Sequence, residues 1–410
     1  MSDLPLRAQL AVALGRTASR MSRLAGRGDG SVIGGRIGLA LDPELLTRLA
    51  RDRNLVLVSA TNGKTTTTRL IASAMSGLGE VATNAFGANM PTGHVSALAA
   101  APGARYGVLE CDEKYVPMVL RETGANVVLL MNLSRDQMDR AGEIWQLAGK
   151  WRKALEGVDT HVVANCDDPL VTWGASTAKS VTWVAAGQHW RDDSWCCPEC
   201  GGPLDRDGAA WACRECPFAR PKPDWILHGG RVTAPGGRTY DLSLQLPGRA
   251  NRSNGAMALA VVAQFGIQPD AAMPLLGQVK SVAGRYTTVE YQGRQIRLLL
   301  SKNPAGWLES FDVLEPAPGP VALSINAQGP DGRDTSWLWD VDYRVLRGRP
   351  VWATGERRLD LAARLEAAAV DFVVIDDIEQ AVMAVPPGRL DVIANYTAFQ
   401  DIRTRYGRAL

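Results

Sequence analysis

The sequence predicts an α/β protein whose domains are built on largely parallel sheets. Short apolar runs alternate with helical stretches along most of the chain, which is the pattern of a parallel sheet covered by helices on both faces. One run ends in a Gly-Lys-Thr turn that leads into a helix, and such sheets bind ligands at the carboxyl ends of their strands. Because 410 residues are too many for one hydrophobic core, we expect several domains.

The overall composition is that of a globular protein, with 46% hydrophobic and 21% charged residues. A net charge of +2 gives no electrostatic reason to expect a nucleic-acid or acidic partner. No apolar run approaches the roughly 20 residues that a membrane span needs. The N-terminal segment, residues 1–40, mixes arginines with apolar residues and is not a signal peptide. It forms either an amphipathic helix on the inner membrane surface or a helix packed on its own domain, and its modest hydrophobic face favours packing. We therefore expect a cytoplasmic protein.

A phosphate-binding loop is predicted at Thr61-Asn62-Gly63-Lys64-Thr65-Thr66, after the apolar run 55–58 and before a helix over 68–77. The backbone N–H groups and the positive end of the helix dipole would face an anion. Lys64 would reach the β- and γ-phosphates, and the Thr65 hydroxyl would ligate Mg²⁺. The first glycine of the usual pattern is missing, because Val58 stands there. The alternative is a strand–helix turn that contains Gly-Lys-Thr by chance.

Two further strand ends carry polar residues that would lie beside this loop. Glu110 ends the apolar run 106–109 and is the predicted second ligand of Mg²⁺, with Asp112 and Glu113 as competitors. The other strand, 125–132, leads into the polar segment Asn132-Leu133-Ser134-Arg135-Asp136-Gln137-Met138-Asp139-Arg140. That segment predicts a loop of the site, although its aspartates are also suited to cap the next helix.

The rest of the chain divides into an insertion, the end of the central domain and a second α/β unit. We predict a turn over 247–255 and a helix over 256–265, then a loop-like stretch over 304–320. Beyond it the predicted strands are 321–325, 351–353, 372–375 and 392–395, with a helix over 359–369. The predicted domains are 1–40, 41–300 and 301–410, and residues 191–223 form an insertion in the second.

Five of the seven cysteines lie within the insertion, while Cys111 and Cys166 have the setting of buried thiols. Two Cys-x-x-Cys pairs, Cys197 with Cys200 and Cys213 with Cys216, have the spacing of a tetrahedral Zn²⁺ site. Four thiolates leave no position for water, so the site would be structural. The alternatives are free thiols or two disulfides, or a register that uses Cys196. The mixed charges of the insertion argue against nucleic-acid binding.

Several of these segments resemble the Mur ligases, and they occur in the order of that family. Residues 60–66 look like the family's ATP loop, and 132–140 resembles its Asn-x-x-x-Asp-His-Leu-Asp motif. The others are Val163 to Pro169 (VANCDDP), Leu246 to Ala260 (LPGRANRSNGAMALA) and Gly284-Arg285-Tyr286. The resemblance implies that Asn251 or Asn254 orients adenine and that Arg285 lies near the phosphates or ribose.

Two departures from the Mur ligases resemble one branch, MurT, the synthetase subunit of lipid II isoglutaminyl synthase. Gln137 replaces the family's histidine, and the cysteine-rich insertion is foreign to the amino-acid-adding ligases. Lys302-Asn303-Pro304 and the segment 331–340 also look like MurT signatures. The implied fold is a Mur ligase-like central domain with an inserted four-cysteine zinc ribbon, followed by a smaller, Rossmann-like C-terminal α/β domain.

This resemblance implies ATP-dependent amidation of the α-carboxylate of D-glutamate in the lipid II stem peptide, a step of peptidoglycan biosynthesis. Transfer of the γ-phosphoryl group would give an acyl phosphate that ammonia attacks, with Lys64 and a Mg²⁺ held by Thr65 and Glu110 stabilising the phosphoryl group. Asp136 and Gln137 would border the substrate or a second metal.

The implied partner is a GatD-like class I glutamine amidotransferase that supplies ammonia and forms a heterodimer with this chain. In the family an aspartate of this chain is thought to complete the partner's Cys–His pair. Asp334 is the predicted residue, with Asp331 and Asp340 as alternates. The structural alternative is that Asp334 caps a turn, since Asp-Gly is a common turn signal.

Two other functions remain open from the sequence. One is an amino-acid-adding ligase of the Mur or folylpolyglutamate type, against which Gln137 and the cysteine pairs count. The other is a P-loop ATPase that is not a ligase and that uses hydrolysis to change conformation.

Overall fold

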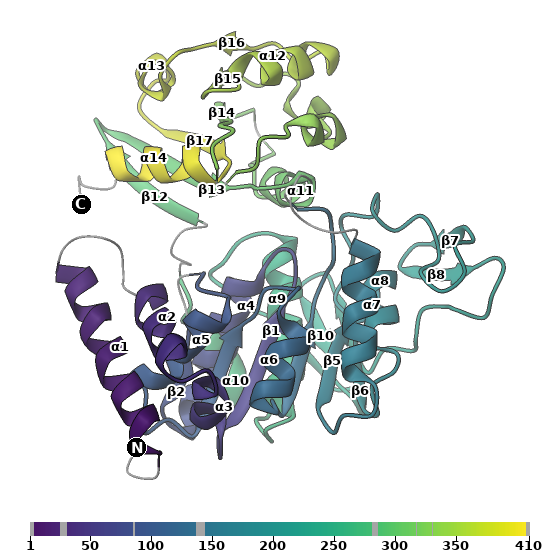
Figure 1. The fold of residues 1–410 in the computed structure, drawn as a ribbon. Helices are drawn as coiled ribbons and strands as arrows, with labels where there is room; N and C mark the ends of the chain where they lie inside the picture. Colours follow the sequence, from purple (N-terminus) through teal and green to yellow (C-terminus); the bar gives the residue numbers. More distant parts are fainter. Residues whose placement is uncertain are drawn as a thin grey trace.

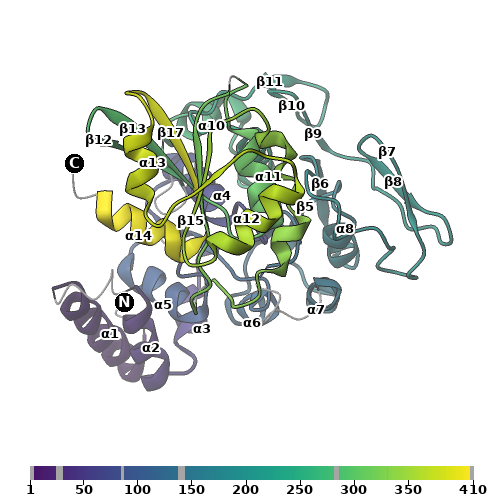
Figure 2. The same ribbon diagram turned by 90° about the horizontal axis from the view of Figure 1, so that it is seen from above.

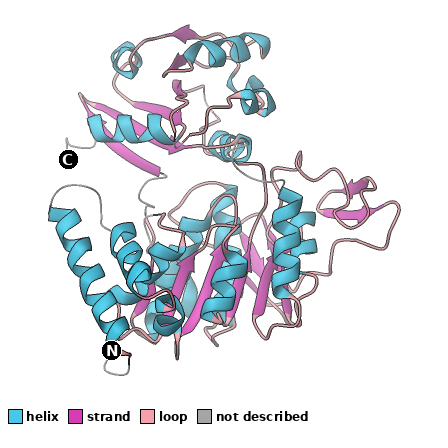
Figure 3. Cartoon of the chain, viewed as in Figure 1, coloured by secondary structure: helices cyan, strands magenta, loops and turns pink. Residues whose placement is uncertain are grey.

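The structure, a computed structural model, describes residues 4–24, 31–84, 87–136, 144–280, 286–316, 318–329 and 331–406. Two sheets carry the fold, one lying above the other in Figure 1, each with helices packed on it. A small two-stranded hairpin projects from the side of the larger sheet (Figure 3). The α/β architecture that the sequence predicts is therefore confirmed.

The larger sheet has nine strands in the order β11-β10-β9-β6-β5-β4-β1-β3-β2. The strands β2, β3, β1, β4, β5, β6 and β9 are parallel, and β10 and β11 extend the sheet with antiparallel pairing. Their bounds are β1 Asn54–Ser59, β2 Val81–Thr83, β3 Tyr106–Glu110, β4 Val127–Leu130, β5 His161–Asn165, β6 Val181–Ala185, β9 Trp225–His228, β10 Arg231–Thr233 and β11 Thr239–Asp241.

Helices cover both faces of this sheet because the residues of its central strand alternate between two cores. Leu55 and Leu57 of β1 belong to one hydrophobic cluster, and Val56 and Val58 belong to the other. The Leu55 face carries α3 Leu45–Ala50, α5 Pro91–Ala100, α6 Val116–Thr123, α7 Ile144–Leu155 and α8 Pro169–Ala175. The Val56 face carries α4 Lys64–Met75, followed by the short 3₁₀ helix η1 Ser76–Leu78, with α9 Arg249–Ala263 and α10 Pro269–Leu276.

The register of the strands brings the predicted site segments to one edge of the sheet. Val58 of β1 pairs with Glu110 of β3, and Ser59 pairs with Leu130 of β4. The phosphate loop, Glu110 and the segment after β4 therefore follow three adjacent parallel strands. This is the carboxyl edge, where such sheets bind ligands.

The N-terminal segment forms two helices, α1 Leu6–Leu24 and α2 Ser31–Leu41, which pack beside α5 at one side of the molecule (Figures 1 and 2). Ala8, Ala11 and Val12 of α1 are buried in the core of the larger domain. One face of α1 is therefore packed on its own domain. Among the described residues no helix has both the length and the apolar character that crossing a membrane requires.

The second sheet has six strands in the order β12-β13-β17-β14-β15-β16, parallel except for the β12–β13 hairpin. It begins at Tyr286, ahead of the boundary predicted after residue 300, because β13 pairs with β17. The strands are β12 Tyr286–Tyr291, β13 Arg294–Leu300, β14 Val321–Ser324, β15 Val351–Thr354, β16 Val373–Val374 and β17 Arg389–Ala394. The helices are α11 Pro304–Asp312, α12 Arg358–Ala367, α13 Ile378–Ala384 and α14 Tyr396–Tyr406, with 3₁₀ turns η2 Ser336–Asp340 and η3 Tyr343–Leu346.

Two predicted loops are helical, and in both cases the sequence contains the reason. The stretch 304–320 begins with α11, whose N-cap Asn303 accepts a hydrogen bond from the Gly306 N–H at 2.9 Å and whose first residue is Pro304. Proline suits the first position of a helix, so reading it as a loop signal was wrong. Helix α9 begins at Arg249 rather than at 256, after Gly248 at φ +91°.

Candidate functional site

The phosphate loop turns from β1 into α4 through Gly63, which adopts the left-handed conformation at φ +86°. A Cβ atom at this position would lie 2.7 Å from Oδ1 of Asn254 on α9. The backbone conformation therefore favours glycine, and a side chain here would also displace the Asn254 amide. The loop residues Thr61, Asn62, Lys64, Thr65 and Thr66 are all buried at the start of α4.

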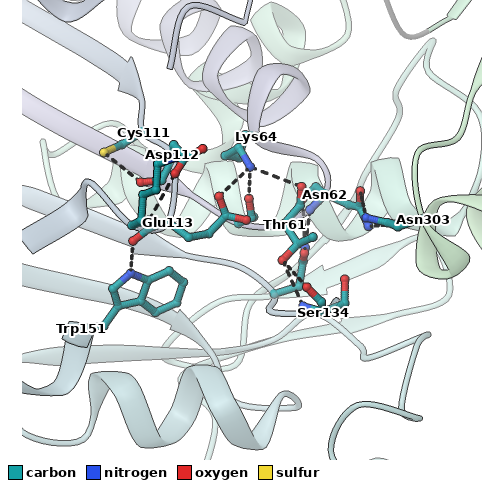
Figure 4. Close-up of polar contacts among 12 residues, drawn as sticks. Thr61, Asn62, Lys64, Cys111, Asp112, Glu113, Ser134, Trp151 and Asn303 are labelled. Atoms are coloured by element: carbon teal, nitrogen blue, oxygen red, sulfur yellow. Dashed lines mark hydrogen bonds and ion pairs between the residues drawn. The ribbon is translucent and has the colours of Figure 1, made fainter. Parts of the chain in front are cut away.

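The Lys64 ammonium is held by the loop and by an acid. Its Nζ donates to the backbone oxygens of Ala60 and Thr61, the latter at 3.3 Å, and lies 3.2 Å from Oε2 of Glu113 (Figure 4). Burial raises the pKa of Glu113, and the Lys64 charge opposes that rise. Trp151 donates to the Glu113 backbone oxygen at 2.8 Å, which fixes this turn. Glu113, one of the predicted competitors, is thus the acid that pairs with Lys64.

Glu110 stands at the end of β3 with only 2% of its surface exposed. Asn84 clamps its backbone, accepting from the Glu110 N–H at 2.7 Å and donating to the Glu110 carbonyl at 2.8 Å. The His94 Nε2 lies 2.7 Å from the same carbonyl, and burial lowers the His94 pKa to about 4, so this ring is neutral. Within the described part of the chain the Glu110 Oε2 is buried without a hydrogen-bond partner. An orphaned carboxylate oxygen fits a metal-ligand position.

The segment after β4 is bonded directly to the phosphate loop. The Asn132 side chain accepts from the Asn62 N–H at 2.9 Å and donates to the Asn62 carbonyl at 3.0 Å. The Thr61 hydroxyl donates to the Ser134 carbonyl and accepts from the Ser134 N–H, at 3.1 and 3.0 Å. The predicted loop of the site is therefore adjacent to the nucleotide loop. Gln137 lies outside the described residues.

A small cavity of about 60 Å³ lies between these loops and α9. Its lining includes Asn62, Asn132, Asp168, His189 and Asn254. Burial raises the Asp168 pKa to about 6, against the lowering effect of the backbone N–H groups of Leu133, Val171 and Leu170. Of the predicted adenine-binding residues Asn254 lines this cavity, and its Nδ2 lies 3.3 Å from Oδ1 of Asn251, which is on the preceding turn of α9. Arg285 is outside the described residues.

Residues of the C-terminal domain close over the phosphate loop. Asn62 donates to Oδ1 of Asn303 at 3.0 Å, and both side chains are buried (Figure 4). At the start of α9, the Arg249 N–H donates to Asp312 at 2.7 Å and its guanidinium pairs with the same carboxylate. Arg135 pairs with Asp193 and lies 3.3 Å from Asp340 of η2.

The three candidate partner-facing aspartates have different surroundings. Asp334 is exposed, and the N–H of Ser336 donates to it at 2.8 Å, which lowers its pKa. Asp331 accepts from the N–H and the hydroxyl of Thr397 at the start of α14, so it ties two elements together. Asp340 faces Arg135. Asp334 is the only one of the three without a contact to a distant element among the described residues.

The four predicted zinc ligands form one cluster. The sulfur atoms of Cys197, Cys200, Cys213 and Cys216 all lie within 4.8 Å of one another, which suits a single ion with Zn–S bonds of about 2.3 Å. Cys196 is not part of this cluster. Backbone N–H groups point at two of the sulfurs, Gly202 at Cys200 (3.4 Å) and Glu215 at Cys213 (3.3 Å).

The ribbon around this cluster, with strands β7 Leu204–Asp207 and β8 Ala210–Cys213, is attached to the edge of the site. The Trp211 indole donates to the Cys166 carbonyl at 3.0 Å, and Arg220 pairs with Asp167 at 2.6 Å. Arg206 donates to Gln188 at 3.0 Å and to the Ser194 carbonyl at 3.0 Å. The ribbon therefore supports both the end of β5 and the segment 186–194, part of which lines the small cavity.

Sequence reasoning did not assign Asn303, His189 or Asp168 to the site. The first two lie far from the phosphate loop in the chain, and only the folded structure brings them to it. For Asp168 a local signal existed, since an Asp-Pro pair after a strand is a typical helix cap, and its side chain accepts from Leu170 and Val171. The third bond, from the Leu133 N–H at 3.0 Å, could not be read from the sequence.

Comparison with known proteins identifies two parts of the chain. Residues 58–195 match the Mur ligase middle domain, and residues 300–399 match the MurT ligase C-terminal domain. The lipid II isoglutaminyl synthase (glutamine-hydrolyzing) subunit MurT of Streptococcus pneumoniae is 29% identical, over 96% of this chain and 96% of the relative. The Staphylococcus aureus subunit of the same name is 28% identical, over 98% and 99%.

Solved structures show the same fold at low sequence identity. A pseudomurein peptide ligase type C from Methanothermus fervidus superposes with a TM-score of 0.71 at 16% identity, covering 90% of this chain and 81% of that one. MurF from Acinetobacter baumannii superposes with a TM-score of 0.66 at 13% identity, and the match covers 90% of this chain and 80% of the MurF chain. These structures show the fold, and the two matched domains with the near full-length relatives place the chain in the Mur ligase family, within its MurT branch.

Proposed function

We propose that this chain is the synthetase subunit of a lipid II isoglutaminyl synthase. It would use ATP to convert the α-carboxylate of the D-glutamate in the lipid II stem peptide into an amide. The observation that carries the proposal is the meeting of three parts at one sheet edge: the phosphate loop, the partnerless carboxylate oxygen of Glu110, and Asn303 from the MurT C-terminal domain.

The chemistry explains why such a site needs a nucleotide. A carboxylate repels nucleophiles and has no good leaving group, so it must first be activated. Attack of a carboxylate oxygen on the γ-phosphorus of ATP forms an acyl phosphate and releases ADP. Ammonia then adds to the carbonyl carbon, loses a proton, and phosphate leaves with the bonding pair. The protein has to position these groups and neutralise charge.

The residues of this chain suit those tasks. The buried Lys64 ammonium, which Glu113 and the loop carbonyls hold in this structure, would turn to the β- and γ-phosphates. Thr65 and Glu110 are the proposed ligands of a Mg²⁺ ion, which would supply positive charge to the phosphates. Asn254, with Asn251 behind it, is proposed to orient adenine, and Arg285 to lie near the phosphates or ribose.

Asp136 and Gln137 are proposed to border the substrate or a second metal. Oδ1 of Asp136 is buried without a hydrogen-bond partner among the described residues, and Asp136 follows Ser134, which is bonded to Thr61. A second metal ion, or an N–H or O–H group of the substrate, would satisfy that oxygen.

The nitrogen is proposed to come from a GatD-like class I glutamine amidotransferase bound to this chain. The names of the curated relatives support such a partner, since they describe a subunit of a glutamine-hydrolysing enzyme. The exposed Asp334 is the proposed contribution to the partner's Cys–His pair, because an exposed carboxylate can reach a second protein and orient its histidine. The four-cysteine cluster is proposed to hold a structural Zn²⁺ that shapes the segment 186–194.

The test is reconstitution of the full chain with a glutamine amidotransferase of this class. We expect the D-glutamate α-carboxyl group of lipid II to become an amide only when ATP and glutamine are both present. Mass spectrometry would detect this as the replacement of the carboxyl OH by NH₂. Incorporation of an amino acid instead would identify an amino-acid-adding ligase. ATP hydrolysis that needs neither lipid II nor an ammonia source would identify an ATPase that is not a ligase.

A further inference from the structure

Helix α1 has two apolar faces, and the larger side chains are on the outside. The buried face consists of small residues, namely Ala8, Ala11, Val12 and Gly15. The exposed face, which we call the leucine stripe, consists of Leu6, Leu10, Leu14, Met21 and Leu24. Leu6 and Leu24 are 73% and 89% exposed. A helix that only packs on its own domain buries its large apolar residues.

Close packing of α1 on α2 explains why the inner face is small. A Cβ atom on Gly15 would lie 2.6 Å from the Gly34 carbonyl oxygen, and one on Gly34 would lie 2.7 Å from the Gly15 carbonyl oxygen. The two helices therefore touch along their backbones, and only small residues fit between them. The leucine stripe lies outside this close contact, and each of its residues is more than half exposed.

The charged residues within α1 and α2 are all positive. Helices α1 and α2 contain no acidic residue, and their arginines are Arg7, Arg16, Arg20, Arg23 and Arg36. The whole chain carries a net charge of only +2, so these two helices concentrate positive charge on one side of the molecule. Large apolar side chains flanked by arginines, without acids, are the pattern of a helix that lies in the interface of an anionic bilayer.

We propose that the leucine stripe of α1 docks this enzyme onto the surface of an anionic lipid bilayer. The inference rests on the proposed function, because an acceptor with a lipid tail is held at a membrane. The leucines would enter the headgroup and acyl boundary, and the arginines would bind lipid phosphates. A second copy of the chain fits this face less well, since a symmetric contact would bring like charges together.

A cavity lies on the packed side of α1. It has a volume of about 570 Å³ and is lined by Arg16 and Arg20 of α1 and also by Asn84. Asn84 is the residue that clamps the backbone of Glu110, at 2.7 and 2.8 Å. Docking through α1 would therefore place the bilayer on the side of the molecule where this cavity lies, next to a residue that contacts the end of β3.

The test is flotation of the full chain with vesicles of equal parts phosphatidylglycerol and phosphatidylcholine. The variant Leu10→Ser/Leu14→Ser/Met21→Ser should bind roughly tenfold more weakly or worse, because it removes three large apolar side chains from the interface. Arg16→Gln/Arg20→Gln should weaken binding by a similar factor, with a reduced dependence on salt. The matched control is Leu359→Ser/Val373→Ser, which removes exposed apolar residues of the C-terminal domain and should bind like the wild type.

Three results would overturn docking: a wild type that does not float, stripe variants that float like it, or a wild-type dimer that the stripe substitutions dissociate. Amidation of lipid II in detergent micelles, assayed with the partner present, keeps the two proposals separate. Stripe variants that lose flotation but keep this activity support docking. A wild type that floats but does not amidate would contradict the proposed function and leave docking standing.

Discussion

Asn62 of the phosphate loop and Asn303 at the start of α11 form a buried amide pair, with the Asn62 Nδ2 donating to the Asn303 Oδ1 at 3.0 Å and the reverse contact at 3.4 Å. The first residue belongs to the nucleotide loop and the second to the MurT C-terminal domain. A nucleotide that moved Asn62 would therefore disturb a contact of the C-terminal domain, to which the partner is proposed to bind.

The first prediction separates this pair from the helix cap that Asn303 also provides. In Asn303→Ser the hydroxyl can still accept the Gly306 N–H, but it is too short to reach Asn62. We expect the free energy of unfolding to change by less than about 1 kcal/mol, while ATP-dependent amidation falls roughly tenfold. Asn303→Ala, the control, should lose stability as well. Full activity of the serine variant would show that the pair is not needed for turnover.

The second prediction concerns Glu110 as a metal ligand. Glu110→Gln keeps the size of the side chain and removes its charge, so half-maximal activity should need at least about tenfold more Mg²⁺. Asp112→Asn, two residues on and partly exposed, is the matched control and should titrate like the wild type. If the wild type and both variants need the same Mg²⁺ concentration, Glu110 is excluded as a metal ligand. If only the Asp112 variant needs more Mg²⁺, Asp112 is the ligand instead.

The third prediction is an acid-sensitive stability that depends on His94. Its pKa is about 4 in the folded protein, because burial disfavours the charged ring, and 6.5 when exposed. Between pH 6.5 and pH 4 the His94 ring is protonated in the unfolded chain but neutral in the folded one. The His94 contribution to the free energy of unfolding is therefore fully present above pH 6.5 and is lost as the pH falls towards 4. The loss contributed by this group is up to ~3 kcal/mol.

Urea unfolding at several pH values checks this. The His94→Gln variant should show a flatter decrease of stability between pH 6.5 and 4 than the wild type. His228→Gln, at an exposed position on β9, is the control and should follow the wild-type curve. Parallel curves for all three proteins would mean that other groups cause the acid sensitivity.

The sequence predicts the parts of the site that share a sheet edge, because strand ends are a local feature. The loop 61–66, Glu110 and the segment after Asn132 follow adjacent strands, as the alternation of strands and helices implies. It does not predict which acid Lys64 meets, since Glu110 and Glu113 are both near the strand end and only the turn fixed by Trp151 brings Glu113 to the ammonium. The sequence also does not predict to which sheet the hairpin 286–300 belongs. Hairpin signals are local, whereas β13 pairs with β17, which lies far along the chain.

The fourth prediction is one zinc ion per chain, held by the four clustered cysteines. Cys200→Ser should lose the metal, measured by elemental analysis, and should lower the melting temperature, because metal binding contributes to folding. Cys196→Ser, next to the cluster but outside it, should keep both. Loss of the metal should also loosen the segment 186–194, which Arg206 of the ribbon holds through Gln188 and Ser194, and so weaken ATP binding. A metal-free protein with unchanged melting and ATP affinity would contradict a structural role.

The last prediction concerns Asp334 and the partner subunit. Asp334→Asn keeps the cap to Ser336, because an amide oxygen can accept the same N–H, and it removes the charge that would stabilise the partner's histidine. We expect glutamine-dependent amidation to fall roughly 100-fold or more, while amidation with added ammonium salt stays at the wild-type rate. Asp342→Asn is the matched control, because Asp342 is also exposed and also accepts from the N–H two residues on, and it should leave both rates unchanged. If the Asp334 variant also loses the ammonia-dependent rate, the residue acts on the synthetase site. If it loses neither, a shared triad through Asp334 is excluded and the alternates Asp331 and Asp340 become the candidates, of which Asp340 is already paired with Arg135.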